Sequence, residues 1–138
     1  MQTEKEIVIR RYFEELFNQG KVELTAELLA PDYVNHSTAS PAQSRGPDGV
    51  VDVVLALRRA FPDLEYEILD LVEGDSAVAV RTRMTGTHLG DFFGTPPTGR
   101  SFDVSQITIE QFRGNRIVAH HRLTDELGLL RQLGLVNA

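Results

Sequence analysis

The sequence predicts an α+β fold in which three N-terminal helices pack on a curved antiparallel sheet with an internal cavity. Two observations predict it. Apolar residues recur at helical spacing as far as Pro62 and alternate at strand spacing after it. Short turns join the strand-like runs, which is typical of an antiparallel meander. Because a bent sheet wrapped over helices makes a cone, the expected shape is a cone-shaped α+β barrel.

Each of the three helices has its own signals. Residues 3–19 carry a broad apolar stripe, begin with the capping-box spacing of Thr3 and end before a glycine. Residues 21–30 form a short second helix that a proline stops. Residues 47–61 open with a proline and place apolar side chains at steps of four, three and four. Together the three helices supply the apolar layer on which a sheet can pack.

Four strands are expected after Pro62, at residues 64–72, 77–87, 100–113 and 116–125, followed by a last helix. The apolar phase of the third strand slips, because Phe102 and Val104 are even-numbered whereas two isoleucines at 107 and 109 are odd-numbered. A one-residue slip exchanges the faces of a strand, so a bulge near residues 105–106 is predicted to bend the sheet.

Composition narrows the classes of function. The 138 residues fit one domain, residues 1–138, and the absence of cysteine excludes disulfides and thiol nucleophiles. With a net charge of −6 and no basic stripe, nucleic acid is not an expected partner. No apolar run is long enough for a membrane span and the N-terminus is charged, so we expect a cytoplasmic protein. No two of the four histidines have helical metal-ligand spacing, and no metal site is expected.

The last strand carries the candidate catalytic residues. Alternation places His121 and Asp125 on the same face as Ile117, Ala119 and Leu123, which predicts that both point into the cavity. Burying an imidazole and a carboxylate costs free energy, and buried titratable groups are common at functional sites. The alternative interpretation is that Asp125 only caps the helix that follows it. His120 has the opposite parity and is expected on the outside.

Polar and aromatic side chains elsewhere are candidates for substrate binding. Some of these side chains lie on the first helix and on the short extended piece after the second helix. Two adjacent phenylalanines lie in the glycine-rich loop of residues 89–99, where they would cover the pocket mouth or contact a second subunit. The candidate binding residues are Tyr12, Tyr33, Asn35, His36, Phe92 and Phe93.

Several segments, taken in order, resemble a known family. They are Tyr33–His36, Gly86–His88, Gly94–Arg100, Gly114–Val118, and Asp125 with the Leu-Arg-Gln-Leu-Gly sequence at 130–134. The chain is similar to the SnoaL-like polyketide (ester) cyclases of the nuclear transport factor 2-like superfamily. The resemblance implies an enzyme that closes a ring by an intramolecular aldol step in an apolar cavity, without cofactor or metal. It also implies a small hydrophobic or polyketide-like substrate.

The resemblance assigns roles to particular residues. The acid/base position of the family matches Asp125, and His88 matches the family's Gly-Thr-His segment and is the preferred partner of that carboxylate. Relatives commonly carry tryptophan where His121 stands, which adds a second candidate donor or base. Relatives pair through the convex face of the sheet, so a homodimer is expected.

Two other functions on the same fold stay open. An epoxide hydrolase of the limonene epoxide hydrolase type needs two carboxylates and an arginine around one water, and Asp125, Asp103 and Arg81 or Arg83 are the candidates. A small-molecule-binding module without catalysis is the other alternative, because a fold does not determine an activity.

Overall fold

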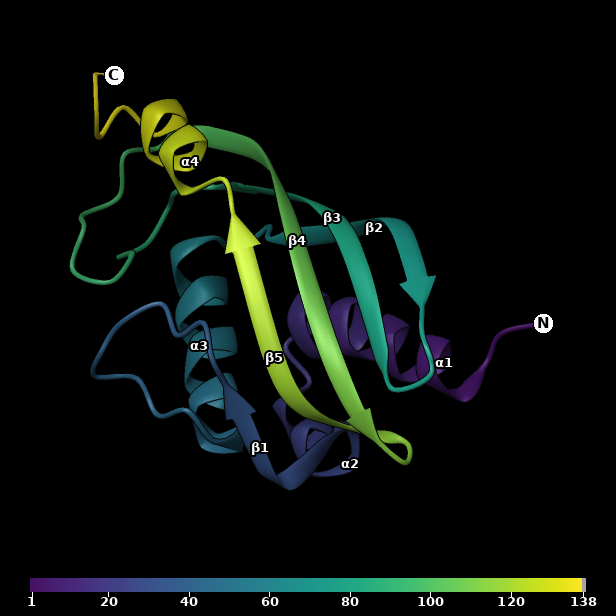
Figure 1. The fold of residues 1–138 in the computed structure, drawn as a ribbon. Coiled ribbons are helices and arrows are strands. Elements are labelled where there is room, and N and C mark those ends of the chain that lie inside the picture. The colour runs from purple at the N-terminus through teal and green to yellow at the C-terminus, as the bar shows by residue number, and fades with distance from the viewer. Residues whose placement is uncertain (138) are drawn as a thin grey trace.

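The computed structural model describes residues 1–137 and has the predicted α+β architecture (Figure 1). The helices are α1 (Glu4–Arg11), which continues as a π-helix over Tyr12–Phe17, then a 3-10 turn (Val22–Leu24) with α2 (Thr25–Leu28), α3 (Pro47–Ala60) and α4 (Glu126–Gln132). The strands are β1 (Leu29–Asn35), β2 (Glu65–Glu73), β3 (Ala77–Thr87), β4 (Ser101–Arg113) and β5 (Arg116–Thr124). The fold class predicted from the sequence is confirmed.

The sheet has five strands in the order β1-β5-β4-β3-β2. The four predicted strands form an antiparallel meander, as expected, but β1 adds to β5 in parallel, so the sheet is mixed. Leu29 and Ala30, which the sequence placed in the second helix, begin this edge strand. The curved sheet wraps over α1 and α3, and α4 closes the end of the cone where β5 finishes (Figure 1).

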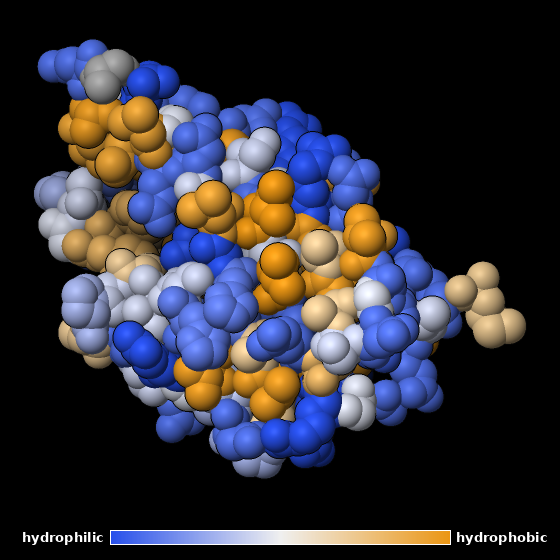
Figure 2. All heavy atoms as spheres, viewed as in Figure 1, coloured by the Kyte–Doolittle hydropathy of each residue, from blue (hydrophilic) through white to orange (hydrophobic). Residues whose placement is uncertain are grey.

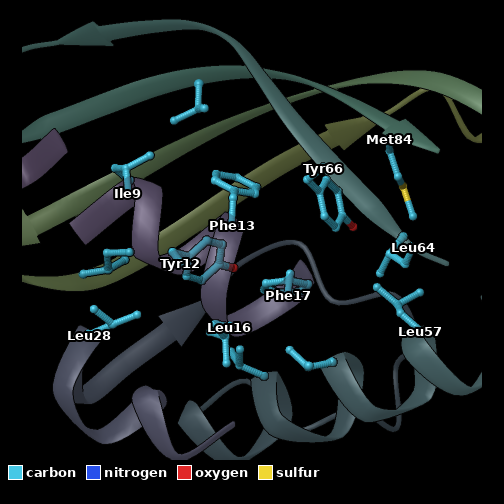
Figure 3. Close-up of a cluster of buried hydrophobic side chains, with 14 of the residues drawn as sticks. Ile9, Tyr12, Phe13, Leu16, Phe17, Leu28, Leu57, Leu64, Tyr66 and Met84 are labelled. Atoms are coloured by element: carbon cyan, nitrogen blue, oxygen red, sulfur yellow. The ribbon is translucent and has the colours of Figure 1, made fainter. Parts of the chain in front are cut away.

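The hydrophobic core lies between the concave face of the sheet and the helices. Ile9, Phe13 and Leu16 from the N-terminal helix are at most 1% exposed, and Figure 3 shows Phe13 beside Tyr66 of β2. Burying side chains of this size is the main source of stability in a domain of this length. The same layer forms one wall of the cavity described below.

The predicted bulge in the third strand is wrong. Strand β4 alternates without interruption between exposed and buried residues along its whole length, and it pairs with β3 in one continuous register. The even-numbered residues face the cone, so Gln106, Thr108 and Glu110 are buried, whereas Ile107 and Ile109 are 50% and 45% exposed on the outer face. The apolar residues change from even to odd positions in the middle of β4 because the inner face carries polar side chains at that point.

The register shift lies instead in β5. Gln111 pairs with Ala119 and the next residue, Phe112, pairs with Ile117, so Val118 is an extra residue on the β5 side. A single extra residue exchanges the faces of the strand beyond it. Beyond the bulge the inner face therefore carries the even-numbered residues of β5, beginning with His120, and the odd-numbered ones point outward.

A hydrogen-bonded carboxylate ties the segment after α3 to the end of β3. Asp63 accepts from both the backbone N–H and the hydroxyl of Thr87, each at 2.7 Å. These bonds, the hydroxyl's first among them, lower the pKa of Asp63 below its ordinary value. A lowered pKa in the folded state stabilises the fold at pH values above the unfolded pKa of about 3.9. That stabilisation is lost as the pH falls through the folded pKa.

Asp63→Asn is therefore expected to lower the melting temperature at pH 7, and the difference from wild type should shrink as the pH falls from about 5 to 3. The reason is that the wild-type carboxylate loses its advantage on protonation whereas the amide does not titrate. Melting followed by circular dichroism over this range measures it. A difference that stays constant with pH would show that the charge of Asp63 contributes nothing.

Candidate active site

A cavity of about 560 Å³ opens on the concave side of the sheet. One part of its wall is apolar and comes from the N-terminal helix, α3, β3, the loop after β3 and α4. It includes Phe13, Phe17, Val50, Val53, Leu57, Met84, Phe92, Phe93, Leu129 and Leu130. The other part is polar and comes mainly from β4, β5 and the segment after β1; it includes Tyr12, Asn35, Ser37, Ser40, Gln43, Tyr66, Thr95, Gln106, His120, Arg122, Thr124 and Glu126.

A histidine of the polar wall is paired with a buried carboxylate. His120 and Glu110 are opposite each other on β5 and β4, and Nδ1 of His120 lies 2.8 Å from both carboxylate oxygens. The side chains are only 6% and 0% exposed. An ionised carboxylate only accepts hydrogen bonds, so a hydrogen bond to the ionised form of Glu110 requires the proton on Nδ1. The other ring nitrogen, Nε2, makes no hydrogen bond within residues 1–137, and the ring lines the cavity.

A fixed arginine lies on the same strand, two residues further along. Its guanidinium donates to the backbone oxygen of Ser37 at 3.0 Å and to the hydroxyl of Thr124 at 2.7 Å, and its backbone N–H donates to Ser37 Oγ at 2.9 Å. The Thr124 hydroxyl donates in turn to Gln106 at 2.7 Å. This network fixes Arg122 in the wall of the cavity next to the buried pair.

Two tyrosines face the same space from the helical side and from β2. Tyr12 and Tyr66 line the cavity, and their hydroxyl oxygens point toward the region around Phe17 (Figure 3). Burial, the largest cause, raises the pKa of both phenols above the ordinary tyrosine value, and Arg122 opposes the shift. Both hydroxyls therefore stay protonated near neutral pH and can donate hydrogen bonds.

The position of Tyr12 depends on the π-helix. In this segment the N–H of Asn18 donates to the carbonyl of Phe13, five residues back, so the turn is wider than in an α-helix. Single π-helical turns are frequently found at functional sites. The wider turn buries Tyr12, Phe13 and Phe17 together, with the Tyr12 ring 5.0 Å from each phenylalanine ring.

Four of the residues predicted from the sequence line the cavity: Tyr12, Asn35, Phe92 and Phe93. Asn35 accepts from the backbone N–H of Ser37 at 2.8 Å and so shapes the segment that holds Arg122. The two phenylalanines come from the loop between β3 and β4. Their ring centroids are 5.1 Å apart, so the rings lie side by side. Their position supports the interpretation that this loop covers the pocket mouth.

Asp125 does not point into the cavity, so that expectation is wrong. Its side chain is exposed and accepts from the N–H of Gly128 at 2.9 Å, which makes it the N-cap of α4. The helix-cap interpretation describes its position. The physical reason for the error is the bulge at Val118, which reverses the parity on which the assignment rested.

The two histidines assigned as partners of Asp125 also lie elsewhere. His88 is fully buried beside Phe61, outside the cavity wall, and its Nδ1 contacts both the N–H and the hydroxyl of Thr98 at 3.2 and 3.1 Å. These hydrogen bonds hold the base of the loop between β3 and β4 in place. His121 is exposed on the outer face and stacks on His36 with ring centroids 4.7 Å apart.

The remaining predicted residues are separated from the cavity as well. Tyr33 is buried near Glu110, whose charge, after burial itself, helps to raise the pKa of its phenol. The arginines and Asp103 considered for an epoxide hydrolase form exposed ion pairs, Arg81 with Asp70 and Arg83 with Asp103, each at 2.5 Å. They do not converge with Asp125 on one enclosed space.

Glu110 and Arg122 were missed in the sequence, and the expectation that His120 lies on the outside is wrong, because the bulge at Val118 turns it into the cavity wall. The signal that could have found them is the even-numbered series Phe102, Val104, Gln106, Thr108, Glu110 and Phe112, which alternates without a break if polar side chains are accepted on the inner face. An inward carboxylate in the middle of a strand then requires a partner. The adjacent histidines at 120 and 121 were the candidates for it.

Within the described residues 1–137, no group of three or more potential ligands could hold a metal ion, and no helix has the length and hydropathy to span a membrane.

Comparisons with known proteins identify relatives along nearly the whole chain. A family model described as SnoaL-like polyketide cyclase matches residues 7–133. The aklanonic acid methyl ester cyclase AcmA of Streptomyces galilaeus is 30% identical over 131 residues, which cover 94% of this chain and 91% of AcmA. The aklanonic acid methyl ester cyclase DnrD of Streptomyces peucetius is 31% identical over 136 residues, covering 97% of this chain and 92% of DnrD.

Solved structures show the same fold. TsrD from Streptomyces laurentii has a TM-score of 0.88 at 26% identity and covers 99% of this chain and 98% of its own. IdmH from Streptomyces antibioticus has a TM-score of 0.81 at 33% identity, covering 96% of this chain and 99% of its own. The family model and the relatives extend over nearly the whole described fold, including the cavity. The chain therefore belongs to the SnoaL-like polyketide cyclase family.

Proposed function

We propose that this chain is a cyclase or isomerase of the SnoaL-like type, which abstracts a proton next to a carbonyl by acid/base catalysis without a cofactor. The observation that carries the proposal is His120 in the wall of a largely apolar cavity, paired with the buried carboxylate of Glu110. The substrate would be a small, mostly apolar, polyketide-like molecule with at least two carbonyl groups. In this proposal His120 takes the role that the sequence assigned to Asp125.

The geometry supports a defined sequence of proton transfers. Nε2 of His120, the nitrogen not bonded to Glu110, accepts a proton from the carbon next to a carbonyl. The Glu110 carboxylate stabilises the imidazolium that results, and it keeps the ring in the required tautomer. The hydroxyls of Tyr12 and Tyr66 are placed to donate to the enolate oxygen. In a cyclisation the enolate carbon then attacks the second carbonyl, and His120 returns its proton to the new alkoxide.

Hydrogen–deuterium exchange into a ketone tests the proposal. With 2-tetralone in D2O, wild-type protein should accelerate deuterium incorporation next to the carbonyl, followed by NMR. His120→Asn should lose on the order of 10²- to 10⁴-fold of the rate, the range expected for removing a general base. His121→Asn is the matched control, because it changes the neighbouring histidine on the outer face and should keep the rate.

Two results would contradict the proposal. If wild-type protein binds ketones but never accelerates exchange, the cavity is a binding module. If His121→Asn abolishes exchange and His120→Asn preserves it, the base lies outside the cavity and the assignment of His120 is wrong.

We also propose that the protein forms a homodimer through the outer face of the sheet. Five exposed apolar side chains gather there on β2, β4 and β5, and Figure 2 shows hydrophobic surface over these strands. They are Leu69, Val72, Ile107, Ile109 and Leu123, between 41% and 80% exposed. Contiguous exposed apolar surface of this kind commonly marks a protein interface.

Replacing Ile107 and Ile109 together with lysine is expected to convert the dimer to a monomer, because a second subunit would have to bury two unpaired charges. Sedimentation velocity at micromolar concentration measures the change in mass. Exchange activity on the ketone should persist, since the cavity lies on the other side of the sheet. A wild-type protein that already sediments as a monomer would contradict the proposal.

A further inference from the structure

The one carboxylate that Arg122 contacts within residues 1–137 is exposed, and the contact is long for a hydrogen bond. The nearest carboxylate oxygen within residues 1–137 belongs to Glu126, at 3.4 Å from Nη1, and the Glu126 side chain is 68% exposed. Arg122 itself is 21% exposed. Glu110, the other carboxylate nearby, has both oxygens on His120. A long contact to a solvated carboxylate gives only weak compensation, because water screens it.

The guanidinium is also held still in the cavity wall. Nη2 donates to the Ser37 carbonyl and Nη1 to the Thr124 hydroxyl, both neutral acceptors that fix the position of the guanidinium without cancelling its charge. Nη1 also makes the 3.4 Å contact to Glu126, and the other N–H groups have no acceptor within residues 1–137. The field of the guanidinium reaches across the cavity, since it acts on the pKa values of both Tyr12 and Tyr66 against the larger effect of their burial. A fixed, partly desolvated cation that retains free N–H groups is suited to bind an anion, and a planar carboxylate above all.

We infer that the substrate of this cavity carries a carboxylate, which binds Arg122 while the reacting carbon lies at His120. The two residues occupy successive inward positions of β5, so their backbones are roughly 7 Å apart along the strand. A ligand of a few fused rings spans that distance with its acid group at one end. The position of the reacting carbon rests on the proposed function, but the binding of the acid group does not.

Binding of a matched acid and ester tests the inference. Anthraquinone-2-carboxylate and its methyl ester have the same ring system, and titration calorimetry at pH 7 compares them on the wild-type protein. The acid should bind at least about tenfold more tightly, as expected for a charge-assisted hydrogen bond in a partly buried site. Equal affinities, or no binding of the acid at millimolar concentration, would overturn the inference.

Two variants separate charge from shape. Arg122→Gln should remove the preference for the acid, and Arg122→Lys should retain part of it, provided that their melting temperatures show folded proteins. Glu126→Gln removes the competing carboxylate, so it should strengthen binding of the acid about two- to fivefold relative to the ester. An unchanged acid affinity in Arg122→Gln would overturn the assignment.

The outcomes for the two proposals are distinguishable. If His120→Asn abolishes deuterium exchange while acid and ester bind equally, the proposed function stands and the carboxylate site is wrong. If the acid preference depends on Arg122 but wild-type protein does not accelerate exchange, the carboxylate site stands and the proposed chemistry is wrong.

Discussion

Glu110→Gln should reduce the rate of deuterium exchange by on the order of 10²- to 10⁴-fold while leaving the fold intact. The substitution keeps the size and shape of the side chain but removes the charge. A glutamine amide can donate to Nδ1 of His120, which favours the tautomer with the proton on Nε2. The nitrogen that should accept the substrate proton is then already protonated, and no carboxylate remains to stabilise an imidazolium.

The matched control is Thr108→Val on the same strand. Thr108 is 1% exposed, faces the same side as Glu110, and its hydroxyl has no hydrogen-bond partner within residues 1–137. Replacing it with the isosteric valine should leave both exchange rate and melting temperature close to wild type. If Glu110→Gln and Thr108→Val have equal exchange rates, the carboxylate plays no part in proton abstraction.

Phe61→Ala should destabilise the protein by about 3–5 kcal/mol, the usual range for truncating a fully buried phenylalanine. The ring is 0% exposed and contacts three other rings, those of Phe102 at 4.7 Å, Phe92 at 5.1 Å and His88 at 5.7 Å between centroids. It therefore joins the end of α3 to the sheet and to the loop at the pocket mouth. Urea unfolding should show a lower midpoint with an unchanged slope.

Leu55→Ala provides the comparison. Leu55 lies on α3 but is 45% exposed, and its truncation should cost less than about 1 kcal/mol because little buried surface is lost. If Phe61→Ala cost no more than this control, the ring cluster would contribute nothing beyond what a surface residue does, contrary to its burial.

Much of the fold could be predicted because periodicity is a local property. The helices and the four strands of the meander follow from spacing and from turn residues, and the structure places them within a few residues of the predicted bounds. The parallel pairing of β1 with β5 could not be predicted this way. It joins residues more than 80 positions apart, and only tertiary packing brings them together.

The candidate site was predicted only in part, for a physical reason. Tyr12, Asn35, Phe92 and Phe93 were identified because aromatic and polar side chains next to apolar runs commonly line pockets. Glu110 was passed over because the change in apolar parity along β4 was interpreted as a bulge. The strand is regular, and its inner face carries polar side chains while the isoleucines lie outside.

The extra residue at Val118 has a consequence for comparing members of the family. Because the bulge sets which of two adjacent histidines faces the cavity, a relative whose strand has the same length but pairs regularly would present the position of His121 inward while its sequence still matched at both histidines. A sequence alignment would then transfer the role of an inner residue to a surface side chain. Deleting the extra residue itself would keep His120 inward, because Ala119 and His120 would still pair with Gln111 and Glu110.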